Sequence, residues 1–275
     1  MVGLSAILIF FMGEYRMQIY VCVKHVPDSA AHIAIVGKDR IDENVSFLLN
    51  PYDEHAVTEA VRLVADQPDS EVIAVCLGKP DAEKTLRSAM AMGADRGILI
   101  VSNQRHDSIE TARALKAVIE QDGRPQLIFT GKESIDAGGM QTMFRLGELF
   151  GFPVATNVVR LDIEGDPALD HVLVDCELSG GLLNTYEMSL PCLIGAGRGL
   201  NIPIYPTFRN VVKSKKKPIQ EIAFADLNIG VLPGGMDIVE LEPLEQTRKP
   251  REITGNPDEI AGKIIQILKR EAKVI

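Results

Sequence analysis

Short apolar runs alternate with helical patterns along the first half of the chain. The runs span residues 19–23, 72–77, 98–101 and 127–130, and the segments between them carry apolar residues at three- and four-residue spacing. Buried strands separated by amphipathic helices are typical of a parallel sheet with crossover connections. The pattern therefore predicts an α/β fold with a mostly parallel sheet and crossover helices.

Local signals mark the ends of two of these helices. Asn50 is expected to cap a helix that starts at Pro51, and a second helix over 81–92 is expected to stop at Gly93, which tolerates a left-handed backbone. Between the first strand and the first helix, residues 33–41 are expected to form a small hairpin.

The pattern of apolar and polar residues changes after Pro153. Residues 154–161, 172–178 and 182–188 alternate as antiparallel strands do, and 190–194 form another buried run. From residue 199 onward the chain is rich in proline and lysine, which favours an extended arm that leaves the compact body. We therefore expect an α/β nucleotide-binding domain over 17–198, with an added antiparallel portion, and a C-terminal arm over 199–275.

The last helix has its own start signal. Asn256, Pro257 and Glu259 stand at the positions of a capping box, and an apolar stripe follows. The stripe comprises Ile260, Ile264, Ile267 and Leu268. A helix with such a face needs a cover, and a partner subunit would provide it.

Residues 1–16 do not fit the fold pattern. Leu4 to Met12 are apolar, but the run is shorter than the roughly 20 residues of a membrane-spanning helix, and it lacks the features of a secretory signal. We expect 1–16 to be a non-native or disordered extension, with a weak peripheral anchor as the alternative reading. No transmembrane span is predicted.

Charge and cysteine content narrow the range of partners and functions that we expect. The chain has 38 acidic and 29 basic residues, so its overall field repels polyanions and nucleic acid is not an expected partner. The four cysteines are far apart in the sequence and predict reduced thiols in a cytoplasmic protein. The five histidines show no metal-binding spacing, so no metal site is predicted.

The stretch GKESIDAGGMQT, residues 131–142, directly follows the fourth apolar run. Ligands bind at the carboxyl ends of parallel strands, where helix N-termini present free N–H groups, and glycines allow a phosphate to approach closely. The stretch is therefore either a nucleotide phosphate cradle before a helix over about 140–150 or an ordinary glycine-rich turn. It is not a P-loop, because the lysine-bearing GxxxxGK[ST] pattern is absent.

Other glycine motifs are weaker. Residues 195–200 fail as a dinucleotide fingerprint because Leu200 occupies the last glycine position, and we interpret them as the exit of the chain from the sheet. Ser179-Gly-Gly181 is interpreted as a hairpin turn. No GxSxG motif or other catalytic constellation is present, so no catalytic residue is predicted.

Taken together, several segments resemble one family, the small (beta) subunits of electron-transfer flavoproteins. The resemblance runs from Met17 nearly to the C-terminus and excludes 1–16. The matching segments are 21–28, 49–54, 91–97, 131–142, 190–191, 206–210 and 213–217.

The resemblance implies a heterodimer whose alpha subunit holds most of the site for a redox-active FAD, while the beta subunit buries AMP. The chain would be an electron carrier subunit rather than an enzyme with its own catalytic residues. It would accept electrons from acyl-CoA-type dehydrogenases and pass them to a quinone-linked or iron–sulfur oxidoreductase. The nucleotide-binding residues carried over from the family are Cys22, Lys24, Asn50, Pro51, Tyr52, Asp53, Leu77, Gly131, Lys132, Ser134, Asp136, Gly138, Gly139, Met140, Gln141 and Thr142.

The family's dehydrogenase-docking loop has an apolar anchor followed by lysines. Phe208 stands at the anchor position here, and Lys213 and Lys216 match the lysines. The C-terminal arm would then pack on the alpha subunit.

Two alternatives stay open. An electron-bifurcating branch of the family holds a second FAD in place of AMP, and the Gly138-Gly-Met-Gln-Thr142 sequence departs from that branch's phosphate loop. The chain could instead be a stand-alone adenine-nucleotide-binding enzyme or sensor, against which the missing P-loop lysine counts.

Overall fold

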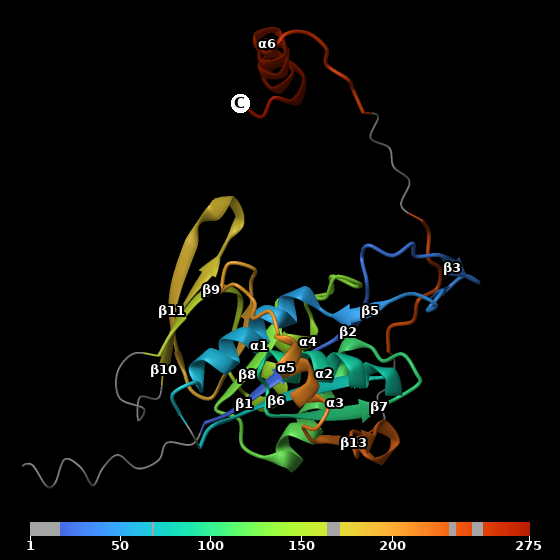
Figure 1. The fold of residues 1–275 in the computed structure, drawn as a ribbon, viewed down its shortest axis with the longest axis vertical. Coiled ribbons are helices and arrows are strands. Elements are labelled where there is room, and N and C mark those ends of the chain that lie inside the picture. Colours follow the sequence, from blue (N-terminus) through green and yellow to red (C-terminus); the bar gives the residue numbers. More distant parts are fainter. Residues whose placement is uncertain (1–16, 68, 164–170, 231–234, 244–249) are drawn as a thin grey trace, which may run out of the picture. The chain divides into compact units, whose positions relative to one another are not determined.

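A computed structural model of the chain describes residues 17–67, 69–163, 171–230, 235–243 and 250–275 (Figure 1). The expectation for residues 1–16 lies outside the described residues. The chain divides into two compact units: the larger holds Ile41–Ile238 with the chain up to Ala34, and the smaller holds Ile35–Arg40 with Val239–Ile275.

The larger unit is built on a nine-stranded sheet, which confirms the predicted α/β class. Its order is β11-β10-β9-β12-β8-β1-β6-β7-β13. All neighbours from β9 to β13 pair in parallel, and β10 and β11 add the antiparallel portion. The strands are β1 (Gln18–Cys22), β6 (Glu71–Gly78), β7 (Arg96–Val101), β8 (Leu127–Gly131), β9 (Val154–Asp162), β10 (His171–Glu177), β11 (Leu183–Ser189), β12 (Cys192–Ala196) and β13 (Ile219–Ala223).

Two small sheets lie between β1 and the first helix. β2 (His25–Pro27) pairs antiparallel with β5 (Phe47–Leu49), and β3 (Ile35–Val36) pairs with β4 (Arg40–Ile41), where the hairpin is predicted.

Four helices cover the two faces of the large sheet. α1 (Pro51–Leu63) and α2 (Glu83–Met92) pack on one face, whose core includes Val21 and Phe129. α3 (Ser108–Asp122) and α4 (Thr142–Phe150) pack on the other. The expected stop of α2 is confirmed, since Gly93 has a φ of 142°. Short helical turns lie at Pro80–Ala82, Ser179–Gly181, Phe224–Asp226 and Leu268–Ala272.

The segment after residue 199 does not leave the compact body where the sequence pattern predicts. α5 (Phe208–Ser214) packs on α2, and Arg87 Nη1 donates to the carbonyl oxygens of Ser214 at 2.8 Å and Lys217 at 2.6 Å. β13 then becomes an edge strand of the sheet. The proline and lysine content reflects a surface segment rather than an arm, and the compact unit continues to Ile238.

Lys217 explains part of this docking. Its Nζ donates to the carbonyl oxygens of Ala94 at 2.6 Å and Met90 at 3.2 Å, at the C-terminal end of α2. These carbonyls have no partner within the helix, so a cation there is favourable. Lys217 therefore belongs to the body, whereas Lys213 and Lys216 are exposed.

The smaller unit contains α6 (Pro257–Ile267), and its predicted capping box is confirmed. Asn256 Oδ1 accepts from the Glu259 N–H at 2.9 Å, and the Glu259 carboxylate accepts from the Asn256 N–H. On the predicted apolar stripe, Ile264 is 42% exposed. None of the helices in the described ranges combines the length and apolar character that a membrane span requires.

Candidate nucleotide site

Asp53, in the first turn of α1, joins the carboxyl ends of two neighbouring strands. Its Oδ2 accepts from the Lys24 N–H at 2.7 Å, just after β1. Its Oδ1 accepts from the Gly131 N–H, at the end of β8, and from Asn50 Nδ2, both at 2.9 Å. The carboxylate is buried. It therefore fixes the point from which the glycine-rich loop leaves the sheet.

Asn50 does not cap α1 with its side chain as predicted. It occupies the N-cap position, but the Nδ2 donates to the Glu133 carbonyl at 2.9 Å and the Oδ1 accepts from the Ile135 N–H at 3.1 Å. The carbonyl of Asn50, not its side chain, accepts from the N–H groups of Asp53 and Glu54. The side-chain amide of Asn50 therefore bonds to the loop rather than to α1. A sequence pattern cannot identify a partner this far away in the chain.

Gly131 is required by packing between the strand and the helix. A Cβ added there would lie 2.4 Å from Asp53 Oδ1 and 2.6 Å from Tyr52 Cβ. Any side chain would force β8 away from α1. The first glycine of the loop therefore serves the scaffold, and a ligand is not needed to explain it.

Burial sets the protonation of the groups beneath the loop. It raises the pKa of Asp53 to about 7, and hydrogen bonds from Asn50, Lys24 and Gly131 oppose that shift. Burial, with the Asp53 charge as a second cause, raises the pKa of the Cys22 thiol. Cys22 therefore stays a neutral thiol next to the site. Its strand partners are Val75 and Thr130.

Lys24 reaches across to the loop. Its Nζ lies 2.7 Å from both carboxylate oxygens of Asp136 and 3.2 Å from Ser134 Oγ. Although burial raises the pKa of Asp136, the Lys24 charge and hydrogen bonds from Lys24 and Ser134 hold it below its ordinary value. The Lys24–Asp136 ion pair therefore holds the first half of the loop next to the end of β1.

The second half of the loop is open. The Gly138 N–H donates to the Ser134 carbonyl at 2.8 Å, and Gly138 and Met140 have left-handed φ values of 57° and 51°. A Cβ added at Gly138 or Gly139 would meet nothing within 4 Å. Because of the Met140 backbone, α4 starts at Thr142, two residues later than the predicted start near Met140.

The N–H groups of Gly139, Met140, Gln141 and Thr142 find no acceptor among the described residues. They belong to an exposed turn at the N-terminus of α4, where the helix dipole favours an anion. This arrangement fits a phosphate group. The residues present are therefore compatible with a nucleotide held by backbone donors, next to Lys24 and Ser134.

Two cationic side chains from neighbouring segments lie over the ring of Tyr52. Lys132 Nζ lies 5.3 Å from the ring centroid and Arg198 Cζ lies 5.1 Å from it, both within the range of a cation–π interaction. The Lys132 N–H also donates to the Ala196 carbonyl at 3.0 Å. Arg198 was missed by the sequence analysis, which interprets 195–200 only as a chain exit. No local signal could have placed it over Tyr52.

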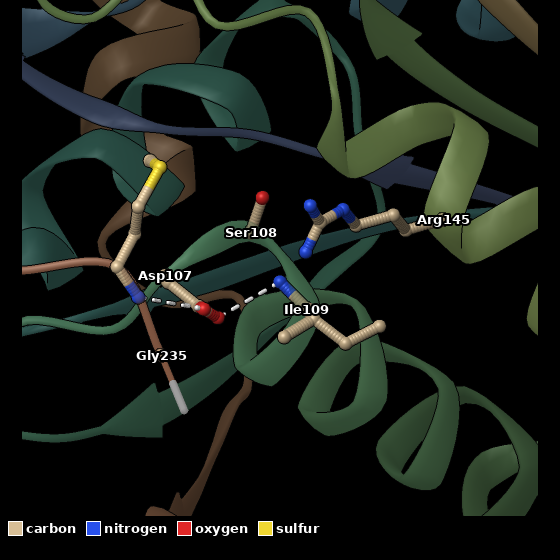
Figure 2. Close-up of a pocket in the computed structure, with 6 residues that line it drawn as sticks. Asp107, Ser108, Ile109, Arg145 and Gly235 are labelled. Atoms are coloured by element: carbon tan, nitrogen blue, oxygen red, sulfur yellow. Dashed lines mark hydrogen bonds between the residues drawn. The ribbon is translucent and has the colours of Figure 1, made fainter. Parts of the chain in front are cut away.

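A small pocket of about 170 Å³ lies beside the loop, between the N-termini of α3 and α4 (Figure 2). Asp107 Oδ1 accepts from the N–H groups of Ile109 and Glu110, and its Oδ2 accepts from the Met236 N–H at 3.4 Å. Arg145 enters from α4, and its Nη2 donates to Gln141 Oε1 at 2.8 Å. Ser108 Oγ donates to the same oxygen at 3.3 Å. Gln141 is thus held by both helices.

The structure brings most of the predicted residues together. Direct contacts connect Lys24, Asn50, Tyr52, Asp53, Gly131, Lys132, Ser134 and Asp136, and the chain continues from there through Gly138 to Thr142. Pro51 opens α1 beside them. Leu77, near the end of β6, lies two residues past the strand partner of Cys22 and has no described bond to the loop. Their roles toward a nucleotide stay predictions.

The predicted docking residues occupy a different surface. Phe208 begins α5 and is 85% exposed, with Thr207 capping the helix through its hydroxyl. Ile202 and Tyr205 nearby are also strongly exposed. Phe208, Lys213 and Lys216 therefore belong to one exposed segment that is anchored on α2 by Arg87 and Lys217.

Comparison with known proteins agrees with this α/β architecture. Residues 40–227, more than half of the chain, match the family model of the electron transfer flavoprotein domain. Three similar proteins are each named electron transfer flavoprotein subunit beta. The one from Bradyrhizobium diazoefficiens is 34% identical over 261 residues, covering 94% of this chain and 100% of that protein.

The other two are from distant organisms. The protein from Arabidopsis thaliana, whose name adds "mitochondrial", is 34% identical with the same coverage. The human protein is 34% identical over 257 residues, covering 91% of this chain and 97% of that protein. The chain therefore belongs to the electron transfer flavoprotein family, among its beta subunits.

Proposed function

We propose that this chain forms a heterodimer with an alpha subunit that holds most of an FAD site, and that its own loop binds AMP, which is not consumed. The observation that supports the AMP site is the group of N–H donors from Gly139 to Thr142, which have no described acceptor at the start of α4. Bound FAD would supply the one-electron chemistry, so the chain itself needs no general acid or base.

The chain's own groups would each have a limited task. The loop N–H groups would hold the phosphate, and Lys24 with Ser134 would lie at its edge. Asp53 and Asn50 would position the loop without contacting the nucleotide phosphate. Cys22, Tyr52 and Leu77 would line the adenosine part at the strand ends.

The alternative of a second FAD receives less support from the sequence, because Gly138-Gly-Met-Gln-Thr142 departs from the phosphate loop of the bifurcating branch. The alternative of a stand-alone nucleotide-binding enzyme receives even less support. Lys24, one of the cations beside the loop, is paired with Asp136, and the sequence has no P-loop lysine.

Cofactor analysis of the complex tests the proposal. The chain should be co-expressed with the alpha subunit encoded beside it, and the FAD and AMP extracted from the purified complex should be quantified. One FAD and one AMP per heterodimer would support the proposal. Two FAD without AMP would favour the bifurcating alternative, and ATP hydrolysis by the isolated chain would favour the stand-alone enzyme.

The exposed segment around Phe208 is proposed as the docking site for donor dehydrogenases. A large apolar side chain that is 85% exposed next to lysines suits an anchor that enters a partner's pocket, with charge guiding the encounter. Phe208→Ala should slow electron acceptance from an acyl-CoA-type dehydrogenase about tenfold or more while the flavin spectrum stays unchanged. Val36→Ala, an exposed apolar change elsewhere, is the control, and equal rates in both variants would remove Phe208 from this role.

The donor, acceptor and location are part of the same proposal. We propose acyl-CoA-type dehydrogenases as donors and a quinone-linked or iron–sulfur oxidoreductase as acceptor. A cytoplasmic location rests on the cysteine pattern of the sequence alone, since the name of the Arabidopsis relative places that protein in mitochondria.

A further inference from the structure

The segment from Asn201 to Phe208, called the docking segment here, carries three large apolar side chains that lie almost wholly in water. Ile202, Tyr205 and Phe208 are 91%, 94% and 85% exposed. Such exposure is unfavourable for side chains of this size. The backbone of the docking segment must therefore be kept from a conformation in which they fold back onto the body.

Asn201 attaches the start of the docking segment to α1. Its Nδ2 donates to the His55 carbonyl at 3.0 Å and to Glu59 Oε2 at 2.8 Å. His55 Nδ1 lies 3.0 Å from the carbonyl oxygen of Asn201 and 3.2 Å from its Oδ1. Both oxygens are acceptors, so His55 Nδ1 carries the hydrogen and donates. Asn201 thus uses its side chain and its backbone toward one helix.

Thr58 attaches the docking segment a second time. The Ile204 N–H donates to Thr58 Oγ1 at 3.0 Å, and Thr58 is 1% exposed. Because positions 55, 58 and 59 lie on one side of a helix, the two attachments follow one line along α1. The α1 clamp is defined by His55, Thr58 and Glu59 with Asn201.

Other contacts fix the far end of the docking segment. Thr207 Oγ1 accepts from the Asn210 N–H at 3.3 Å and caps α5, whose end is bonded to Arg87. Pro203 and Pro206 restrict the backbone between the two ends. The docking segment is therefore short, attached at both ends and stiff, which lowers the entropic cost of binding a partner.

We propose that Thr58 and Asn201 are positioning residues for docking to donor dehydrogenases. They hold the docking segment on α1 so that Phe208 is presented in the conformation that the partner binds. The inference rests on the proposed docking role of Phe208, and it extends that role to a buried residue of α1 that does not touch the partner. Ile202 and Tyr205 stay in water, so the clamp does not serve to bury them; it fixes the backbone.

Two variants of Thr58 test this role in the full heterodimer. Thr58→Val keeps nearly the same shape but offers no acceptor to the Ile204 N–H, whereas Thr58→Ser keeps the hydroxyl. Flavin reduction by an acyl-CoA-type dehydrogenase should be measured at increasing heterodimer concentration. Thr58→Val should raise KM about fivefold, because docking must then order the segment, and kcat should change less than about twofold. Thr58→Ser should behave as wild type, and Asn201→Ala should raise KM as Thr58→Val does.

Amide exchange of the isolated chain tests the clamp without a partner. The Ile204 amide, followed by NMR, should exchange about fivefold faster in Thr58→Val than in Thr58→Ser or wild type. Circular dichroism checks that each variant is folded. Unchanged exchange would overturn the clamp, and equal KM values in the two Thr58 variants would overturn the positioning role.

Phe208→Ala separates this inference from the proposed function. If Phe208→Ala slows electron acceptance and Thr58→Val leaves KM unchanged, the docking role stands and the positioning role of Thr58 fails. If Phe208→Ala has no effect either, the proposed docking function itself fails, which is a distinct result.

Discussion

At the amino-terminal ends of the strands of the large sheet, called the amino edge here, Arg96 lies between two carboxylates. At the carboxyl-terminal ends of the strands, the carboxyl edge, Asp53 lies between three N–H donors. Arg96 Nε is 2.8 Å from Glu71 Oε1 and its Nη2 is 2.7 Å from Asp122 Oδ2, and the Tyr20 hydroxyl donates to the same Asp122 oxygen at 2.7 Å. Every group in that cluster is satisfied by another side chain of the cluster.

The carboxyl edge is completed only in part. Asp53 and Asn50 fix the loop from Gly131 to Ile135, but the loop then continues into N–H groups without described acceptors. The same sheet thus uses one edge for internal pairing, whereas at the other edge some donors have no acceptor among the described residues. This division follows from parallel strands, because helix N-termini face the carboxyl edge. It separates variants that should affect stability alone from variants that should also affect nucleotide binding.

The largest expected effect is at the amino edge. Arg96→Met should lower the free energy of unfolding by about 3 kcal/mol, because Glu71 and Asp122 would be left largely buried without their cation. Urea unfolding of the isolated chain measures it. AMP content of the heterodimer should not change. Arg251→Met, which breaks an ion pair whose arginine and glutamate are 66% and 59% exposed, is the control and should alter stability by less than about 0.5 kcal/mol. Equal effects of the two variants would contradict the closed-cluster interpretation.

Asp53→Asn should have the second-largest effect, and it should change both the stability of the chain and its nucleotide binding. An asparagine offers one acceptor oxygen where three N–H donors converge, so its amide would face at least one of them. We expect a loss of about 2 kcal/mol in unfolding free energy and a lower AMP content. Extraction of nucleotide from the purified heterodimer measures the second effect. Full AMP occupancy in a destabilised variant would show that the loop does not depend on this anchor.

Gly138→Ala tests the open half of the loop. The substitution meets no steric obstacle, but the φ of 57° is unfavourable for alanine and should lower stability by about 1 kcal/mol. Gly139→Ala is the matched control, with equal free space and no left-handed φ, and its stability should stay within about 0.5 kcal/mol of wild type. If both variants unfold alike, the left-handed turn is not the constraint.

The smallest expected effect is a pH dependence at the carboxyl edge. Burial raises the pKa of Asp53 from 3.8 to about 7, so the folded chain retains a proton that the unfolded chain releases as pH rises. This contribution to stability is complete below about pH 4 and is lost as pH rises through 7. Between pH 6.5 and 7.5, wild type should lose about 0.7 kcal/mol relative to Asp53→Asn.

The comparison with Asp53→Asn removes other titrating groups from this measurement. Burial lowers the pKa of His25, which gives the opposite slope, but His25 is present in both proteins. Urea unfolding at several pH values gives the difference directly. A difference that stays constant with pH would show that Asp53 keeps its ordinary pKa in the folded chain.

Sequence patterns predicted the parts of the fold that depend on neighbouring residues. The strands around Val21, Val75 and Phe129, the end of α2 at Gly93 and the capping box at Asn256 all follow from periodicity or from spacing of a few residues. The glycine-rich loop was found in the same way. Its position after a buried strand sufficed to predict that it would reach the carboxyl edge.

Contacts between distant residues decided the rest. Asn50 bonds to Ile135 across 85 positions and Arg198 reaches Tyr52, while β13 pairs with a strand formed about 120 residues earlier. Each of these depends on which segments the folded sheet makes neighbours. The sequence by itself determined the α/β class, the strands and the loop, because hydrophobic periodicity and capping act locally. Only the tertiary structure decided the loop anchors and the edge strand, because these depend on strand order in space.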